Sequence, residues 1–545
     1  MSSIASRLKT AADKSTAPGT VPHLIIIARA GTGKTTTLVE GLKIVKGLPT
    51  DGFTPSPQQA EIWDSMKLSA GVGTVCFAAF NTAIAKELED RIPSGCEAMT
   101  MHRMGFKAVR KAFPTVRQPN SFKSEDILAS LMGKTKAWDL KKERPEFVAA
   151  VSRLVDLCKA NLVDGTPEEL TDLISRYDID TNQSLTDVVE YVPQVLEAAK
   201  NVQRWGCDFS DMIWLPIVLN LQLFKYDLLL VDEAQDLNRC QQELAQRAGK
   251  RLIFCGDDRQ AIYGFAGADC RSMFTLEDQL RQTPQGVEML PLTVTRRCGK
   301  AIVNEAKNYV PNFEAHESNG EGAIKYAAFD PDSPENYRTR VQDGDMVLCR
   351  CNAPLVSECF RFIRSGRKAN IQGRDVGKTL VTTIRNVFKK EGKLNRCSKP
   401  ESWAAMFQTI PVNDLISRIT SWGESEASKE NAKPRPSEPR LNAINDRVSC
   451  ILCFTSGDVT NTQQVIDGIE SLFTDDETDG IKLSSCHKSK GLEADNVFLL
   501  RIVEAPIPHP MAKTREAFDQ EINLLYVAIT RARKVLTYVT SPPKN

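Results

Sequence analysis

Short apolar runs, each followed by a polar loop, recur along the chain and predict buried strands. They lie at His23–Ile27, Val75–Phe80, Leu228–Val231, Leu252–Cys255, Met346–Cys349, Val497–Leu500 and Val535–Val539. Because the runs are continuous and helical segments separate them, they favour parallel sheets that are covered on both faces. The runs form an N-terminal and a C-terminal group, so the pattern predicts an α/β protein with two lobes.

Two stretches between these strands have a different pattern. Residues 106–207 read mostly as helix, with apolar positions at helical spacing from Phe147 to Cys158. Residues 378–476 are mixed, and within them Ser425–Arg440 is rich in Lys, Glu, Ser and Pro, which is typical of a mobile surface loop. We expect both stretches to be insertions. The expected parts are residues 1–105 with 208–290, residues 106–207, residues 291–377 with 477–545, and residues 378–476.

Length and charge narrow the function classes. A chain of 545 residues is too long for one core, and a net charge of +1 means that a nucleic-acid partner would need a local basic groove. No apolar run is long enough to span a bilayer, and the polar N-terminus does not resemble a secretory signal. The 15 cysteines show no spacing that completes a zinc site. We therefore expect an intracellular protein, in the cytoplasm and nucleoid or in a nucleus, that is not secreted and has no membrane partner.

The segment Ala28–Thr35, with the sequence Ala-Arg-Ala-Gly-Thr-Gly-Lys-Thr, follows the first predicted strand and precedes a predicted helix at Thr36–Val45. Glycines in such a loop let backbone N–H groups approach phosphates, Lys34 reaches the terminal phosphates, and the Thr35 hydroxyl would bind Mg²⁺. A simple glycine turn would also join a strand to a helix, but Gly-Lys-Thr in this register favours nucleotide binding. The expected nucleotide contacts are Ala30, Gly31, Thr32, Gly33, Lys34, Thr35 and Thr36.

A second candidate site, which is acidic, follows the predicted strand at Leu228–Val231. Asp232 and Glu233 stand at the end of this strand, the edge of a parallel sheet at which nucleotides bind. Asp232 would hold Mg²⁺, and Glu233 would orient and deprotonate the attacking water. A strand that ends in an acidic helix cap is the alternative interpretation, and the phosphate loop makes it the weaker one.

With these motifs the chain resembles superfamily 1A DNA helicases of the UvrD/Rep/PcrA type, and its form is closest to the F-box DNA helicase and phage branch. The resemblance implies two RecA-like parallel-sheet P-loop domains, each with an inserted subdomain. Seven further segments carry the resemblance in family order: Phe80–Leu88, Thr100–His102, Asp208–Met212, Gly256–Asp269, Leu292–Cys298, Ser485–Glu493 and Leu525–Arg533.

The resemblance also implies residue roles. Gln260 would sense the γ-phosphate, Arg297 and Arg531 would be arginine fingers, and Arg296 replaces a tyrosine that usually stacks on adenine. Gly491 and Glu493 would contact the nucleotide. The implied DNA contacts are Phe80, Asn81, Thr100, His102, Tyr263, Phe265 and His487, with Phe265 in place of a base-stacking tryptophan.

The family usually has a glutamine motif before the phosphate loop, and this chain departs from that order. The segment that contains Gln58 and Gln59 resembles this motif but follows the loop. Two alternatives stay open: one of the two glutamines folds back to the adenine base, or the base is read by other residues.

The leading hypothesis is an ATP- and Mg²⁺-dependent DNA helicase that moves 3′ to 5′ on single-stranded DNA and unwinds duplexes. Its expected partners are single-stranded DNA, junctions of single- and double-stranded DNA, and loader, replication or repair proteins. Three alternatives are a translocase that remodels protein–DNA complexes without processive unwinding, an ATP-regulated binding protein, and a small-molecule kinase. The later motifs have no role in a kinase, and we expect no fused nuclease.

Overall fold

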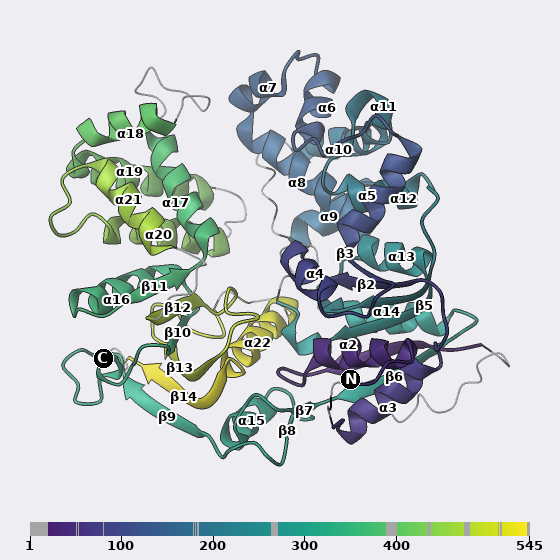
Figure 1. Cartoon of the computed structure of the whole chain (residues 1–545). Helices are drawn as coiled ribbons and strands as arrows, with labels where there is room; N and C mark the ends of the chain where they lie inside the picture. Colours follow the sequence, from purple (N-terminus) through teal and green to yellow (C-terminus); the bar gives the residue numbers. More distant parts are fainter. Residues whose placement is uncertain are drawn as a thin grey trace. The chain divides into compact units, whose positions relative to one another are not determined.

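The computed structural model describes residues 20–50, 52, 54–79, 81–177, 179, 181, 185–262, 271–388, 400–432, 438–473, 480–510, 512 and 515–541. The chain divides into two compact units, residues 1–295 and 296–545 (Figure 1). Three of the predicted DNA contacts, Phe80, Tyr263 and Phe265, lie outside the described residues.

Unit 1 contains a parallel sheet with the strand order β3-β2-β4-β5-β1-β6. Ile27 of β1 is opposite Gly256 of β5 on one side and Pro291 of β6 on the other. The strands are β1 (His23–Ala28), β2 (Val75–Ala79), β3 (Cys96–Thr100), β4 (Tyr226–Val231), β5 (Gly249–Gly256) and β6 (Val287–Leu292), followed by the short β7 (Val294–Thr295). The predicted parallel α/β architecture is confirmed.

Both faces of this sheet are buried, which explains the continuous apolar runs. Leu24 and Ile26 pack under α2 (Lys34–Val45) and α3 (Pro57–Lys67), whereas Ile25 and Ile27 face a second core on the opposite side. That second core includes helices of the segment between β3 and β4. Two further helices of unit 1 are α13 (Arg239–Ala248) and α14 (Ser272–Arg281), and α4 (Thr82–Glu89) follows β2.

The segment between β3 and β4 is helical, as its apolar spacing predicts. Its helices are α5 (Met101–Ala112), α6 (Lys123–Leu131), α7 (Ala137–Glu143), α8 (Pro145–Asn161), α9 (Pro167–Arg176), α10 (Leu185–Ala199), α11 (Val202–Trp205) and α12 (Asp211–Val218). A buried ionic cluster joins α6 and α8 to the start of α12: Asp211 contacts Lys123 at 2.5 Å and Lys159 at 2.8 Å. Asp208 also contacts Lys159, at 2.6 Å.

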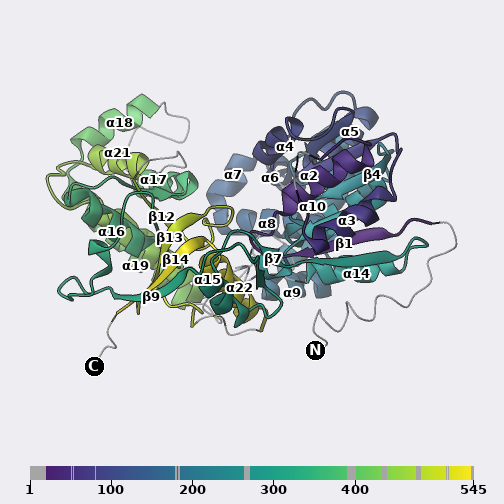
Figure 2. The same cartoon turned by 60° about the horizontal axis from the view of Figure 1, so that its bottom comes forward.

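Unit 2 contains a second parallel sheet with the order β11-β12-β10-β13-β14-β9. Its strands are β9 (Ala323–Ala328), β10 (Met346–Cys349), β11 (Ala369–Gln372), β12 (Ile481–Ser485), β13 (Ala494–Arg501) and β14 (Ala532–Thr540), and the short β8 (Glu314–Ala315) precedes them. The helices α15 (Lys300–Lys307) and α22 (Arg515–Ile529) pack beside β14, as Figure 2 shows, and α16 (Asn352–Arg364) packs near β10 and β12.

Five helices occupy the described part of the stretch from α17 to α21. They are α17 (Arg374–Val387), α18 (Pro400–Thr409), α19 (Val412–Asn431), α20 (Glu438–Cys453) and α21 (Thr462–Leu472). The expectation of a loop at Ser425–Arg440 is wrong for its described residues, which continue α19 and begin α20. The polar composition is misleading because the two helices pack together: Glu430 is buried and forms an ion pair with Arg440 at 3.3 Å.

Among the described residues, no helix combines the length and the apolar character that crossing a bilayer requires.

Candidate active site

The phosphate-loop candidate connects β1 to α2 at the carboxyl end of the sheet. Gly31 and Gly33 have φ angles of 66° and 78°, in the left-handed region that glycine adopts without strain. Because α2 begins at Lys34, the unpaired N–H groups of its first turn belong to this loop, where they can donate to an anion. The other predicted contacts, Ala30, Thr32, Thr35 and Thr36, lie in the same loop or the first turn of α2.

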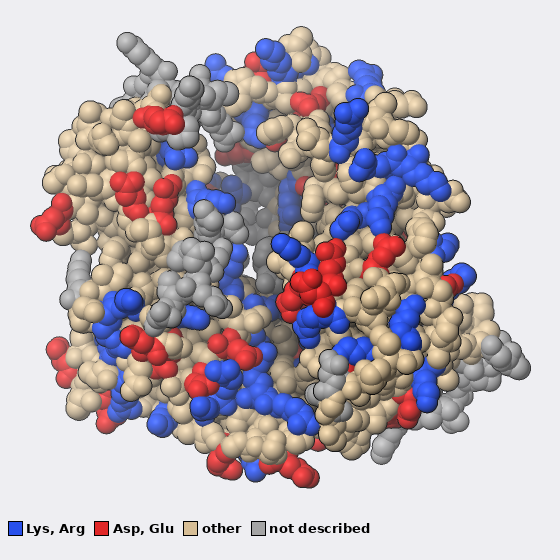
Figure 3. Space-filling view, in the orientation of Figure 1, with Lys and Arg blue, Asp and Glu red and all other residues tan. Residues whose placement is uncertain are grey.

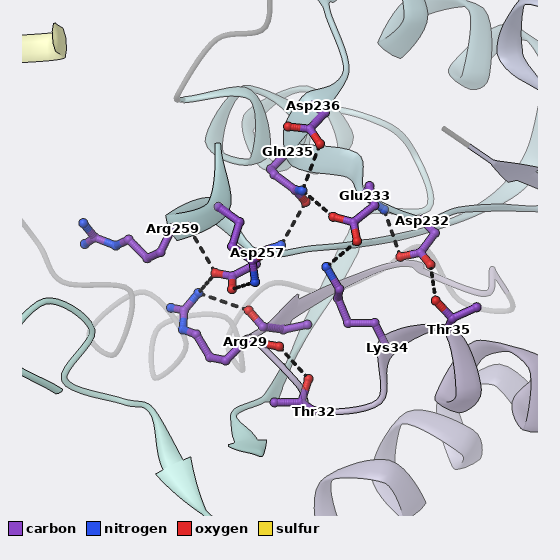
Figure 4. A network of polar contacts seen from close by, with 12 residues as sticks. Arg29, Thr32, Lys34, Thr35, Asp232, Glu233, Gln235, Asp236, Asp257 and Arg259 are labelled. Atoms are coloured by element: carbon purple, nitrogen blue, oxygen red, sulfur yellow. Dashed lines mark hydrogen bonds and ion pairs between the residues drawn. The ribbon is translucent and has the colours of Figure 1, made fainter. Parts of the chain in front are cut away.

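The structure brings the loop and the paired acids together, as Figure 4 shows. The ammonium group of Lys34 contacts Glu233 Oε1 at 2.7 Å, and Thr35 Oγ1 donates a hydrogen bond to Asp232 Oδ2 at 2.7 Å. Both acids directly follow β4, so the neighbouring carboxyl ends of the strands bring them to the loop. The hydroxyl and the carboxylate of the second pair are oxygen ligands of the type that Mg²⁺ prefers.

The electrostatics of these pairs follow from burial. Burial raises the pKa of Asp232, and the adjacent Glu233 carboxylate raises it further. Burial opposes the charge on Lys34, but the Glu233 and Asp232 carboxylates outweigh it and raise the pKa of the amine, so Lys34 stays protonated. Glu233 has a φ of 53°, a left-handed conformation that costs a non-glycine residue roughly 1–3 kcal/mol and is common at functional sites.

Gln260 belongs to the same network. It ends the short helix η4 (Asp258–Gln260), and its amide donates to Asp257 Oδ2 at 2.7 Å. Gln235, in η3 (Ala234–Asp236), accepts a hydrogen bond from the backbone N–H of Asp257 at 3.0 Å and donates to Glu233 Oε2 at 2.5 Å. Gln235 therefore links the acidic strand end to the segment that carries Gln260, a role that sequence reasoning missed.

Sequence reasoning also missed Arg29, which lies within the phosphate loop. Its guanidinium is buried and contacts Asp257 Oδ1 at 2.9 Å and Asp258 Oδ1 at 2.6 Å (Figure 4). The only signal in the sequence is an arginine placed directly after the apolar run Leu24–Ala28. Nothing in the spacing tells where its side chain points.

Gln59 folds back to the phosphate loop, although it follows the loop in sequence. The Gln59 amide donates to Thr37 Oγ1 of α2 at 2.9 Å and lies 3.9 Å from where a Cβ atom on Gly33 would be. Gln58 exchanges two hydrogen bonds with Thr293, at 2.9 and 3.0 Å. Packing of α3 on α2 thus brings the Gln59 amide close to the start of α2, whereas the Gln58 amide lies against Thr293, directly after β6.

Unit 2 gathers several of the other predicted residues. Arg297 forms an ion pair with Glu493 at 2.5 Å, and Gly491, with a φ of 90°, precedes Glu493 by two residues in the loop between β12 and β13. Arg296 is exposed. The structure therefore joins Arg297 and Glu493 directly within this unit.

Arg531 is buried in the same region. Its guanidinium donates to the carbonyl oxygens of Val527 at 2.9 Å and Leu492 at 3.0 Å, and to the Thr530 hydroxyl at 3.2 Å. Burial, and then the nearby charge of Arg297, lowers the pKa of Arg531 to about 10. Arg531 is therefore still a cation at neutral pH, and the three hydrogen-bond acceptors named above are neutral oxygens.

The predicted DNA contacts of unit 1 lie at helix starts. Asn81 accepts a hydrogen bond from the N–H of Ile84 at 2.9 Å and caps α4, and Thr100 accepts one from Arg103 at 3.2 Å and caps α5. Capping alone explains these two residue types, because both satisfy an N–H group that a helix start leaves unpaired.

His102 stacks on Phe209, with ring centroids 4.0 Å apart and planes 23° apart. Phe209 keeps 61% of its surface exposed, so the pair presents an aromatic face to solvent. Burial lowers the pKa of His102 to about 4, which makes the ring neutral at physiological pH. Sequence reasoning placed Phe209 in a segment that resembles the family but gave it no role; an aromatic residue among polar neighbours was the available signal.

The space-filling view shows lysine and arginine side chains gathered over α5 and α12 (Figure 3). The exposed residues of α5 include Arg103, Lys107, Arg110 and Lys111. Glu89 and Glu97 contact the first two at 3.6 and 2.9 Å. The basic surface therefore begins next to His102 and is partly balanced by acidic neighbours.

His487 follows β12 in unit 2. Burial, and then the charge of Arg350, lowers its pKa to about 4. Arg350 contacts Glu521 at 2.8 Å, and Glu521 also accepts from the backbone N–H of His509 at 3.0 Å. His487 therefore lies near a fixed ionic pair at the carboxyl edge of the second sheet.

These observations define a P-loop protein with two RecA-like α/β units. Residues 8–281 match the family model of the UvrD/REP helicase N-terminal domain, and residues 411–541 match that of the UvrD-like helicase C-terminal domain. The chain belongs to the UvrD/REP helicase family.

Named relatives agree with this assignment. The F-box DNA helicase protein 1 of Schizosaccharomyces pombe is 25% identical over 543 residues, which cover 95% of this chain and 55% of that protein. The ATP-dependent DNA helicase PcrA of Staphylococcus aureus is 23% identical, and the PcrA of Bacillus subtilis is 22% identical. Each PcrA match covers 95% of this chain, with 81% and 80% of the relative. The chain thus spans little more than half the length of the fission-yeast relative.

Proposed function

We propose that this protein is an ATP-dependent DNA helicase that moves 3′ to 5′ along single-stranded DNA and couples ATP hydrolysis to duplex unwinding. The observation that carries the proposal is the pair of contacts Lys34–Glu233 and Thr35–Asp232 at the carboxyl edge of the first sheet. A phosphate loop, a pair of candidate Mg²⁺ ligands and a candidate general base meet there, and phosphoryl transfer to water needs these three groups together.

The roles proposed in unit 1 follow from this geometry. The loop residues and the first turn of α2 bind the phosphates of ATP, and Lys34 neutralises the terminal ones. Thr35 and Asp232 would hold Mg²⁺, which neutralises phosphate charge when it is bound. Glu233 orients the attacking water and accepts its proton, and Gln260 senses the γ-phosphate. Of the two glutamines, Gln59 is the candidate for reading the adenine, since its amide lies beside the loop.

In unit 2 we assign Arg297 and Arg531 to the transferred phosphate, and Arg296, Gly491 and Glu493 to the nucleotide. The neutral hydrogen-bond partners of Arg531 support its assignment, because a buried cation held by neutral oxygens gains strongly from an anionic partner. A rigid guanidinium fork stabilises the charge that spreads over phosphoryl oxygens in the transition state.

The DNA surface proposed in unit 1 centres on the stacked His102–Phe209 pair. Stacking of a base on an aromatic face contributes roughly 1–3 kcal/mol and tolerates any base, as tracking along a strand requires. Basic residues of α5 next to this pair supply contacts to phosphates. The remaining proposed DNA contacts are Phe80, Asn81, Thr100, Tyr263, Phe265 and His487.

The division into four parts belongs to the same proposal. Residues 1–105 with 208–290 and residues 291–377 with 477–545 are the two motor domains, and residues 106–207 and 378–476 are their insertions. We place the protein inside the cell, at junctions of single- and double-stranded DNA, with loader, replication or repair proteins as partners.

The test is unwinding of duplexes with a 3′ or a 5′ single-stranded tail, in the presence of ATP and Mg²⁺. The wild type should separate only the 3′-tailed duplex, and Glu233→Gln should separate neither. ATP hydrolysis that single-stranded DNA does not stimulate would overturn the proposal. Displacement of streptavidin from a biotinylated strand without duplex separation would instead identify a translocase that remodels protein–DNA complexes.

A further inference from the structure

A buried arginine in a phosphate loop needs a physical reason. Arg29 is 2% exposed, and the two carboxylates that it contacts, Asp257 and Asp258, are 0% and 5% exposed. Removing three charges from water costs several kcal/mol per ion, and only close ionic contacts offset that cost. A phosphate loop can form without this arrangement, since its glycines and Lys34 supply the cradle.

Sheet topology explains how the three charges meet. Ile27 of β1 is paired with Gly256 of β5, so Arg29 and Asp257 both lie just beyond the last paired residues of adjacent strands. The backbone of Arg29 shapes the loop, because its carbonyl accepts a hydrogen bond from the Thr32 hydroxyl at 2.9 Å. The side chain of the same residue reaches across to the segment that carries Gln260.

Asp257 is the link between Arg29 and Gln260. One of its carboxylate oxygens accepts from Arg29 at 2.9 Å, and the other accepts from the Gln260 amide at 2.7 Å. Burial raises the pKa of Asp257, and the charge of Arg29 opposes that rise and favours the carboxylate form. Without Arg29, the acceptor that orients Gln260 would lose its ionic partner in the loop.

We infer that Arg29 is a positioning residue that couples the phosphate loop to Gln260 through Asp257 and Asp258. The inference rests on the proposed function, because it assigns the way in which the nucleotide state reaches the segment after β5. A shift of the loop carries the guanidinium with it and moves the Asp257 carboxylate that holds the Gln260 amide. Nucleotide binding itself depends on the backbone N–H groups of the loop and on Lys34, and a substitution of the Arg29 side chain leaves both in place.

The principal variant is Arg29→Met, which keeps the length and the apolar part of the side chain. Its KM for ATP should stay within about threefold of the wild type, whereas kcat stimulated by single-stranded DNA should fall by roughly tenfold or more. Arg29→Lys restores the charge without the planar fork and should recover part of kcat. That split between KM and kcat, with rescue by the conservative variant, separates positioning from a purely structural role.

Arg251→Met is the matched control. Arg251 is also buried in unit 1, but it donates to Pro22 O, Ser65 O and the Ser69 hydroxyl near the amino ends of the strands, away from the site. This variant should lower the melting temperature and leave the stimulated kcat of the folded protein unchanged. An equal loss of kcat in Arg251→Met would show that any buried charge defect has this effect, and the inference would fail.

A double variant keeps the test valid if Arg29→Met folds poorly. Asp258→Asn removes one of the two carboxylates from which Arg29→Met takes an ionic partner. The double variant Arg29→Met with Asp258→Asn should therefore regain melting temperature without regaining stimulated kcat. Recovery of both, or full stimulation in a folded Arg29→Met, would overturn the inference. A wild type whose hydrolysis ignores single-stranded DNA would instead overturn the proposed function first, so the two failures are distinguishable.

Discussion

Replacing Phe209 by alanine gives a direct test of the proposed DNA surface. The ring is 61% exposed and stacks on His102 with centroids 4.0 Å apart, so it contributes little to the core and leaves most of its surface to solvent. Loss of one base-stacking contact costs roughly 1–3 kcal/mol. Since each 1.4 kcal/mol is a factor of ten, the Kd for single-stranded DNA should rise by about 5- to 150-fold.

The assay is fluorescence anisotropy of a labelled oligothymidylate at one fixed salt concentration, because phosphate contacts make the affinity salt-dependent. The matched control is Phe224→Ala: Phe224 is 55% exposed in the same unit, and its ring contacts Tyr226 at 4.8 Å rather than His102. Phe224→Ala should bind DNA as the wild type does. An unchanged Kd for Phe209→Ala, or an equal loss in both variants, would refute the proposed platform.

Four further substitutions test the site and the fold. Lys34→Ala should abolish ATP hydrolysis, and Glu233→Gln should still bind a fluorescent ATP analogue but not turn it over; substantial DNA-stimulated turnover by Glu233→Gln would contradict the assigned base. Asp211→Asn, which leaves two buried lysines with weaker partners, should destabilise unit 1 by about 3–5 kcal/mol in urea unfolding, and a midpoint like that of the wild type would contradict the ionic role. Burial lowers the pKa of His23 from 6.5 to about 4, so the unfolded chain binds a proton at a higher pH than the folded chain does. The neutral His23 side chain therefore contributes at most roughly 3 kcal/mol to the free energy of unfolding. This stabilisation is fully present above about pH 6.5 and is lost as the pH falls towards about 4. His23→Asn should therefore show a shallower loss of stability with acid than the wild type does, and equal slopes would argue against it.

The strands could be predicted because burial on both faces of a sheet leaves a continuous apolar run in the local sequence. Ile26 and Ile27 face different cores on opposite sides of one sheet, so a strand buried on both faces is apolar at most of its positions. The spacing of the phosphate loop likewise fixed the expectation that Lys34 and Thr35 lie near the carboxyl ends of the strands. The contacts with Glu233 and Asp232 then follow, because those acids end a strand of the same parallel sheet.

What sequence reasoning missed depends on tertiary contacts. Nothing local shows that Glu430 is buried against Arg440, so the polar composition of that stretch favoured a loop where two helices pack. The same holds for Phe209, whose importance comes from its contact with a residue more than one hundred positions earlier in the chain. Arg29 is the clearest case, since only the order of the strands shows which carboxylates it meets.

The charge balance of the unit 1 network links these missed residues to the proposed chemistry. Among the described residues, the contacts of this network join the carboxylates of Asp232, Glu233, Asp236, Asp257 and Asp258 with the cations Arg29, Lys34 and Arg259. A site rich in carboxylates favours a bound cation, and in the proposed function a divalent ion held by Thr35 and Asp232 would supply that charge. Arg29 contacts the Asp257–Asp258 pair, whereas Lys34 contacts Glu233, which stands beside Asp232. Gln235 joins these two groups of charges, because it contacts both the Glu233 carboxylate and the backbone N–H of Asp257. Under the proposed function, we therefore expect loss of the γ-phosphate beside Lys34 and Glu233 to change the forces on Asp257 and Asp258.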